Sequence, residues 1–103
     1  MAPSPLTAEQ LAAALGDLPG WRVTDGELTA TYRIGRPGTV AFYTAVAAAE
    51  DAADHHARVT ILYGTLTFAV NTHSAGGALT PKDTALAARI AALADEHHAE
   101  PDA

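Results

Sequence analysis

The chain has 103 residues, which is enough for one domain and too few for a TIM barrel or a dinucleotide-binding enzyme with a separate substrate domain. Hydrophobic residues make up 49% and charged residues 17%, as in a globular protein rather than a disordered one. A net charge of −6 without a basic patch argues against nucleic acid as a ligand. The absence of cysteine excludes disulfides, thiolate metal sites and cysteine nucleophiles.

Both ends of the chain carry proline without apolar periodicity, and the C-terminal end also carries Glu100 and Asp102. Residues 1–5 and 99–103 are therefore predicted to be flexible tails around a single domain at 6–98. The N-terminal segment lacks the features of a signal peptide, and the most apolar stretch, residues 40–49, is too short to span a bilayer. We expect a cytoplasmic protein that does not bind membranes. Its small core favours association into oligomers.

The first third of the chain predicts a helix followed by a β-hairpin. Thr7 and Gln10 have the spacing of a capping box, and leucines at helical spacing follow them, which predicts a helix at about 8–16. Residues 21–24 and 27–34 alternate apolar and polar side chains on either side of an Asp-Gly pair. Asp-Gly favours the tight turn of a two-residue hairpin, so these two stretches are predicted to pair.

The middle of the chain predicts a second helix and a second hairpin. Glycine and proline at 35–38 end the first hairpin, and an alanine-rich stretch with apolar residues at helical spacing predicts a helix at about 39–54. Residues 59–62 and 65–73 then flank a Tyr-Gly pair. The longer stretch alternates apolar and polar side chains, which is typical of a strand with one buried face.

A last helix completes the predicted fold. Thr80 is a cap residue, Pro81 takes the first helical position and Asp83 places a carboxylate at the third. The predicted order is α-β-β-α-β-β-α. Three amphipathic helices need a surface to cover, and the economical arrangement is an α+β fold, a four-stranded antiparallel sheet with the three helices packed on one face.

Three histidines lie where predicted elements end, a common place for side chains that meet a ligand. His55 and His56 follow the second helix, and His73 ends the last strand. Imidazole changes its protonation state near neutral pH, so histidines around one cleft can both donate and accept protons.

The spacing of the residues around these histidines is specific. An acidic residue precedes the His-His pair, an aromatic residue follows it, a third histidine comes after nine further residues, and an aspartate lies beyond a glycine-containing loop. The residues at these positions and beside them are Asp51, Asp54, His55, His56, Tyr63, Thr72, His73, Gly76, Gly77, Leu79, Thr80 and Asp83. In this respect the chain resembles the pterin-4a-carbinolamine dehydratases. The resemblance also covers Leu-Pro-Gly-Trp at 18–21 and the Asp-Gly hairpin, so that it spans residues 6–95.

The resemblance implies dehydration of 4a-hydroxytetrahydropterin to quinonoid dihydropterin without a metal or organic cofactor. It implies that His55, His56 and His73 line the pterin cleft. We expect His56 and His73 to lie nearest the atoms that exchange protons, and the sequence does not say which histidine is the acid and which is the base. The residues predicted to bind the substrate are Asp51, Asp54, Tyr63, Thr72, Ser74, Lys82 and Asp83. For assembly, the resemblance implies homodimers that join sheets edge to edge, and homotetramers built through helices.

The chain departs from the family pattern around the expected cleft. Ala57 stands where the family usually has proline, which would fix φ after the His-His pair, so His56 is expected to be aimed less firmly. Ser74 replaces a frequent acidic residue, and the loop after it is one residue longer. Glu50 and Asp51 both lie close to the acidic position. These departures keep open an enzyme of the same fold with another substrate.

Other readings of the same residues remain. Relatives of the family act as dimerisation or assembly factors, so a non-catalytic role is an alternative. Three histidines could also bind zinc, although adjacent histidines normally project apart. The His-His pair could simply favour the negative end of a helix, Asp83 could act only as a capping residue, and Tyr63 could pack rather than bind.

Overall fold

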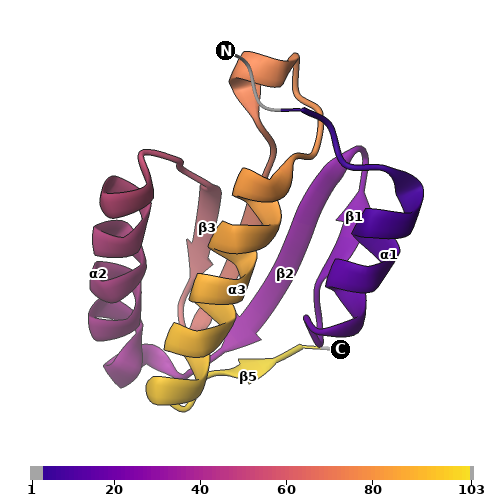
Figure 1. Cartoon of the computed structure of the whole chain (residues 1–103). Coiled ribbons are helices and arrows are strands. Elements are labelled where there is room, and N and C mark those ends of the chain that lie inside the picture. Colours follow the sequence, from indigo (N-terminus) through magenta and orange to yellow (C-terminus); the bar gives the residue numbers. More distant parts are fainter. Residues whose placement is uncertain (1–3, 103) are drawn as a thin grey trace.

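The computed structural model describes residues 4–102, so part of each predicted tail, residues 1–3 and 103, lies outside the described residues. Figure 1 shows the elements in space. In chain order they are α1 (Ala8–Gly16), β1 (Arg22–Thr24), β2 (Glu27–Arg33), α2 (Arg36–Ala53), β3 (Arg58–Leu62), β4 (Thr65–Val70), the 3₁₀ turn η1 (His73–Ala75), α3 (Pro81–Glu96) and β5 (Glu100–Pro101).

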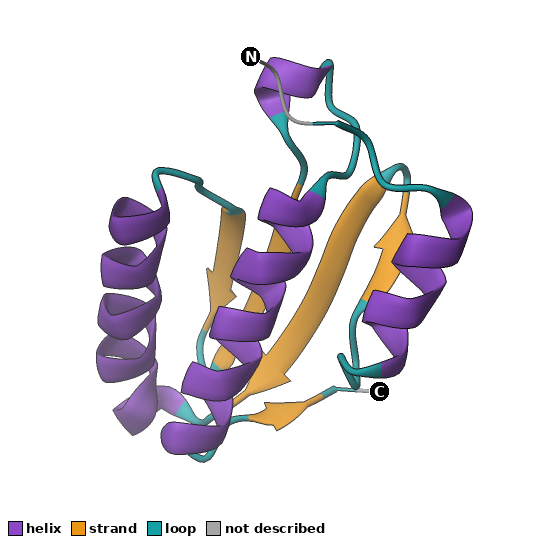
Figure 2. Ribbon diagram, in the orientation of Figure 1, coloured by secondary structure: helices purple, strands orange, loops and turns teal. Residues whose placement is uncertain are grey.

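The strands form one antiparallel sheet in the order β1-β2-β4-β3, and β5 pairs with β2 beyond the end of β1. Figures 1 and 2 show the helices of the described chain over the same face of this sheet, with α2 beside β3, α3 across the middle and α1 beside β1. The α+β prediction is confirmed, and the short β5 adds a fifth strand to the four expected.

The core lies between the sheet and the helices. Alternate residues of the two central strands are buried, including Tyr32 of β2 and Phe68 of β4, and they meet Phe42 of α2. These three rings pack edge to face with centroids 6.0–6.1 Å apart. Such aromatic pairs are worth about 0.5–1.5 kcal/mol each beyond the burial of their area. Trp21 extends the cluster because its Nε1 donates to the Tyr32 hydroxyl at 2.8 Å.

The local capping signals hold, and one helix boundary differs. The reciprocal capping boxes of Thr7 with Gln10 and Thr80 with Asp83 are both present, as predicted. The second helix begins at Arg36 rather than near Thr39. Proline in the first helical turn has no N–H that the helix would need and already has a helical φ, so the Gly-Pro-rich segment starts α2 instead of preceding it.

The structure corrects two further expectations. The strand predicted to reach His73 ends at Val70, and residues 73–75 turn away as η1. The predicted loose C-terminal tail is wrong from Ala99 onward, since Ala99 is buried, Glu100–Pro101 forms β5 and the N–H of Asp102 donates to the carbonyl of Thr31. The edge of β2 beyond β1 has main-chain groups to pair, and this segment pairs them. Residues 4–102 include no helix with the length and hydropathy needed to cross a membrane.

Candidate active site

An open hollow of about 520 Å³ lies at one end of the molecule. There the end of α2, the end of β4, η1 and the start of α3 come together (Figure 2). The hollow is lined by Asp54, His55, His56, Asn71, Thr72, His73, Ser74 and Lys82. All three histidines singled out in the sequence therefore share one concave surface, although His73 is 17 residues from His56 in the chain.

The end of α2 directs the His-His pair toward this hollow. Asp54 is the C-cap and has the left-handed conformation, with φ 50° and ψ 44°. Aspartate tolerates this conformation better than most residues, which lets the chain turn sharply after the helix. The N–H of His55 then donates back to the carbonyl of Glu50 at 3.1 Å, so the first residue of the pair is tied to the last turn of the helix.

His55 points inward and binds a buried carboxylate. Its Nε2 lies 2.6 Å from Oδ1 of Asp83, and the side chains of His55 and Asp83 are 10% and 0% exposed. Asp83 also accepts from the Thr72 hydroxyl at 2.7 Å and from the Thr80 N–H at 2.9 Å, both through Oδ2. Because an ionised carboxylate only accepts hydrogen bonds, the proton of this bond lies on Nε2 of His55.

The hydroxyl groups behind Asp83 complete a chain of hydrogen bonds. Thr72 and Thr80 are 1% and 0% exposed, and their hydroxyl oxygens are 2.7 Å apart. Because Thr72 donates to Asp83, the Thr80 hydroxyl must donate to Thr72, and the Thr80 oxygen in turn accepts from the N–H of Lys82 at 3.2 Å. Each buried polar group in this hydrogen-bond network has a partner, and a buried polar network is rigid when all of its groups are paired.

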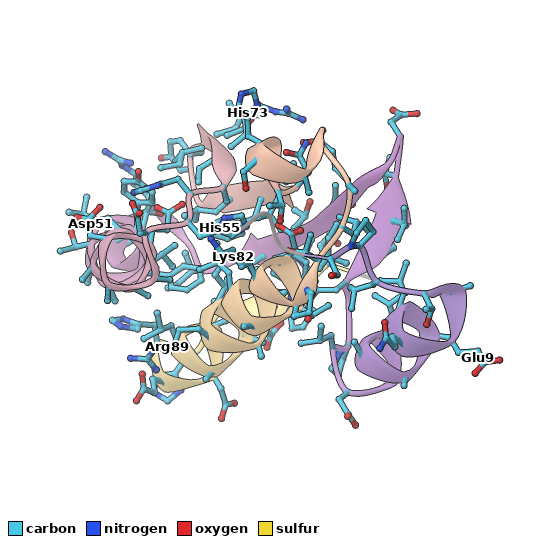
Figure 3. The ribbon with its side chains drawn as sticks, turned by 45° about the horizontal axis from the view of Figure 1, so that its top comes forward. Glu9, Asp51, His55, His73, Lys82 and Arg89 are labelled. Atoms are coloured by element: carbon cyan, nitrogen blue, oxygen red, sulfur yellow. The ribbon has the colours of Figure 1, made fainter. Side chains whose placement is uncertain are left out.

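The other two histidines are more exposed. Nε2 of His56 lies 3.1 Å from Oδ1 of Asp51, and the side chains of His56 and Asp51 are 57% and 78% exposed. His73 is exposed at the start of η1, and Figure 3 shows it projecting at the outer end of the molecule, with His55 further in, near Lys82. The site therefore combines one anchored imidazole with two that solvent and a ligand can reach.

The structure brings most of the predicted site residues together and leaves three off the wall of the hollow. Asp54, Thr72, Ser74 and Lys82 line it with the histidines. Asp51 and Asp83 do not line it, and each forms a hydrogen bond with one histidine. Tyr63 lies in the turn after β3, where its carbonyl accepts from the hydroxyl of Thr39 near the start of α2. Along the axis of α2 this is roughly 20 Å from Asp54, so the fold does not bring Tyr63 to this hollow.

Two residues of the site were not among those predicted from the sequence. Asn71 lines the hollow and donates from Nδ2 to Glu27. A signal for it existed, because strand alternation places Asn71 on the same face as His73. Thr80 supports Asp83 from within the capping box, and the sequence indicated it as a helix cap and as part of the family pattern, without a role at the site.

Other surface features carry less chemistry. A second hollow of about 450 Å³ lies on the face of the sheet opposite the helices, and it is lined mainly by threonines with Arg22 and Asp102 and has no histidine. Within residues 4–102, no group of three or more His, Asp or Glu side chains is arranged to hold a metal ion. The hollow with the three histidines is therefore the candidate active site.

Comparison with known proteins identifies the family of the chain. The sequence model of the family described as pterin 4 alpha carbinolamine dehydratase matches residues 4–93. A protein of Streptomyces coelicolor with the name "Putative pterin-4-alpha-carbinolamine dehydratase" is 42% identical over 100 residues, which cover 96% of this chain and 99% of that protein. A protein of Nocardia farcinica with the same name is 42% identical over 90 residues, or 86% of this chain and 94% of that one.

The fold has a counterpart among solved structures. A protein from Brucella melitensis, described as a transcriptional coactivator/pterin dehydratase, superimposes with a TM-score of 0.82 and 23% sequence identity over 88% of this chain and 99% of the other. At this identity the match shows a shared fold. The family match over residues 4–93 and the relatives above 40% identity lead to one conclusion: the chain belongs to the pterin-4-alpha-carbinolamine dehydratase family.

Proposed function

We propose that this chain removes water from 4a-hydroxytetrahydropterin by general acid and base catalysis with His55, His56 and His73. The observation that carries the proposal is that these three imidazoles line one hollow of about 520 Å³. Pockets for small organic ligands commonly have volumes of about 300–1,000 Å³, so a bicyclic pterin ring is of a suitable size.

The reaction needs two proton transfers and no change of oxidation state. The bond between C4a and the hydroxyl oxygen breaks, and the hydroxyl takes up a proton to leave as water. N5 gives its proton to a base, and the electron pair left on nitrogen forms the C4a–N5 double bond. Each well-placed proton transfer contributes a factor of about 10² to 10⁴. Imidazoles can serve both as the acid and as the base because they titrate near neutral pH.

The three histidines are placed for different parts of this work. His56 and His73 are exposed within the hollow and can reach a bound ring system from two segments of the chain. His55 is held through Nε2 by Asp83, which fixes the orientation of its ring and leaves Nδ1 for the substrate. Lys82 and Asn71 add hydrogen-bond donors to the wall, where they can meet the carbonyl and ring nitrogen atoms of a pterin.

The direct test follows product formation after 4a-hydroxytetrahydropterin is generated in a stopped-flow instrument, with and without the protein. We expect acceleration above the buffer rate, and a loss of about 10²-fold or more in His56→Ala and in His73→Ala. His98→Asn is the matched control because His98 lies outside the hollow, is exposed and has φ 61°, which asparagine also tolerates. A folded protein that does not exceed the buffer rate would remove this activity.

The alternatives are separated by the same variants. The fold neighbour from Brucella melitensis is described as a coactivator as well as a dehydratase, so a protein-binding role is the second candidate. A protein-binding function would persist in cells that carry His56→Ala or His73→Ala. It would be lost when residues on a surface away from the hollow are substituted. An enzyme with another substrate would fail the pterin assay but still lose its own activity in both histidine variants.

A further inference from the structure

Glu50 is a buried carboxylate that the proposed reaction does not use. It lies in the last turn of α2 and is 3% exposed, one of the few charged residues of the described chain to be buried. Burying a carboxylate is costly unless hydrogen bonds replace the water that it loses. Oε2 of Glu50 accepts a hydrogen bond of 2.6 Å from the N–H of Ala57.

This bond joins the helix to the residue immediately after the His-His pair. The carbonyl of the same Glu50 accepts the N–H of His55, which is the first residue of the pair. One residue therefore holds the main chain on both sides of His56, through its carbonyl at His55 and through its side chain at Ala57. Ala57 also packs against the hydrophobic core, which gives this short segment a third point of attachment.

We infer that Glu50 is a positioning residue, which aims the rings of His55 and His56 into the hollow by fixing the main chain from His55 to Ala57. The inference rests on the proposed function, because it concerns the same catalytic histidines. The residues between the end of α2 and the start of β3 have no regular secondary structure to hold them. A side-chain bond from a rigid helix supplies the restraint, and a displacement of about 1 Å in catalytic groups can cost about 10²-fold in rate.

The residue type at position 57 decides which restraint can hold this segment. Alanine leaves φ free to vary, and it has the N–H that Glu50 needs. Proline has the opposite properties, since its ring fixes φ near −65° and it has no N–H to donate. A carboxylate at position 50 and a proline at position 57 are therefore two separate means of holding the same segment, and one can be exchanged for the other in an experiment.

The test is a double-mutant cycle with Glu50→Leu, Ala57→Pro and the two together. Glu50→Leu removes the hydrogen-bond acceptor. We expect kcat to fall by about tenfold or more and KM to change by less than about threefold. The reason is that the histidine rings lose their orientation while the surface that binds the substrate is unchanged. Adding Ala57→Pro should bring kcat back to within about threefold of wild type. Glu50→Gln keeps an acceptor oxygen and should also stay within about threefold.

Two outcomes would overturn the inference. One is a folded Glu50→Leu protein whose kcat stays within about twofold of wild type. The other is a double variant no faster than Glu50→Leu alone. If Glu50→Leu alone does not fold, the double variant decides, because it has neither an unpaired carboxylate nor a free segment and should keep kcat within about threefold of wild type, and a loss of about tenfold or more in the folded double variant contradicts the inference. Glu96→Leu, on the exposed last residue of α3, is the control for exchanging glutamate with leucine.

A second readout does not depend on the substrate. Amide hydrogen exchange at Ala57 should be slow in the wild type and in Glu50→Gln, and about tenfold faster or more in Glu50→Leu. The ring resonances of His55 and His56 should shift in Glu50→Leu and return in the double variant. If the wild type does not dehydrate 4a-hydroxytetrahydropterin, the proposed function fails, while the exchange rate and the ring resonances still decide whether Glu50 positions the pair.

Discussion

Nε2 of His55 and Oδ1 of Asp83 meet at 2.6 Å in the interior, although the two residues are 28 positions apart in the chain. Asp83 is at once the third residue of α3, where it completes a capping box with Thr80, and the anchor of an imidazole from the end of α2. A single carboxylate therefore starts one helix and fixes a candidate catalytic ring at the end of another.

Replacing Asp83 should damage stability and activity together. Asp83→Ala leaves the Thr72 hydroxyl, the Thr80 N–H and the His55 ring without their buried acceptor, so we expect a loss of about 3 kcal/mol in the free energy of unfolding. The dehydration rate of the remaining folded protein should fall by about 10- to 100-fold because the ring of His55 is no longer held. Urea denaturation and stopped-flow assays measure the two effects.

The control for this variant lies on the same helix. Asp95 is exposed near the end of α3, and Asp95→Ala should change the free energy of unfolding by no more than about 0.5 kcal/mol. An equal loss in both variants would show that Asp83 contributes no more than an exposed carboxylate.

His73 should behave in the opposite way, with a large effect on activity and a small one on stability. Its side chain is exposed at the start of η1, so His73→Ala removes little packing and should leave the unfolding free energy within about 0.5 kcal/mol of wild type. The same change should slow dehydration by about 10²-fold or more if this imidazole transfers a proton. Thermal unfolding beside the kinetic assay checks the contrast, and a fully active His73→Ala protein would exclude His73 as a catalytic residue.

The buried phenol of Tyr32 predicts a loss of stability at high pH. Burial raises the pKa of Tyr32 above its usual value of 10.0, and the hydrogen bond from Trp21 opposes this only in part. Above about pH 10 the unfolded chain releases the phenolic proton while the folded protein keeps it, so the folded state loses stability as the pH rises. Urea denaturation between about pH 9 and pH 11 should show this decline.

Tyr32→Phe should remove this part of the pH dependence, at the cost of leaving the indole N–H of Trp21 without its acceptor. The variant is therefore expected to be less stable than wild type at pH 8 and to lose less stability between pH 8 and the alkaline range. Tyr63→Phe controls for the removal of one phenol, since Tyr63 is 78% exposed. Parallel curves for wild type and Tyr32→Phe would contradict the assignment.

The contact between two glycines predicts a pair of substitutions with opposite outcomes. A Cβ added at Gly64, in the turn between β3 and β4, would lie 2.5 Å from the Cα of Gly35. Gly64→Ala must push the main chain apart at that point and should cost about 1–3 kcal/mol in unfolding free energy. Gly16→Ala meets nothing within 4 Å and lies at the end of α1, so it should be neutral or stabilise by up to about 1 kcal/mol. Chemical denaturation of the two variants tests the prediction.

The features that could be predicted depend on residues close together in the chain. Thr7 with Gln10 and Thr80 with Asp83 are three positions apart, and a capping box involves only that distance. The alternation in β2 and β4 needs only neighbouring residues and correctly predicted which face is buried. The end of β4 was predicted three residues too far, because His73 continues the alternation while the main chain already turns into η1.

The contacts of the site residues could not be predicted from neighbouring residues in the sequence. Asp83 was predicted either to bind the substrate or to act only as a capping residue, and neither prediction included its hydrogen bond with His55. Tyr63 was predicted to bind the substrate and lies near the start of α2. Glu50 and Asp51 were interchangeable in the sequence pattern, yet one is buried and bound to Ala57 while the other is exposed and bound to His56.

The amino-acid sequence by itself determined the order of helices and strands, their caps and their apolar faces, because hydrogen bonds and side-chain periodicity within an element involve near neighbours. It also marked the three histidines. Only the tertiary structure decided that Asp83 supports His55, that Glu50 holds Ala57 and that residues 99–102 join the sheet. Those choices depend on how α2, α3 and the strands pack against one another, and packing joins residues whose separation in the chain carries no periodic signal.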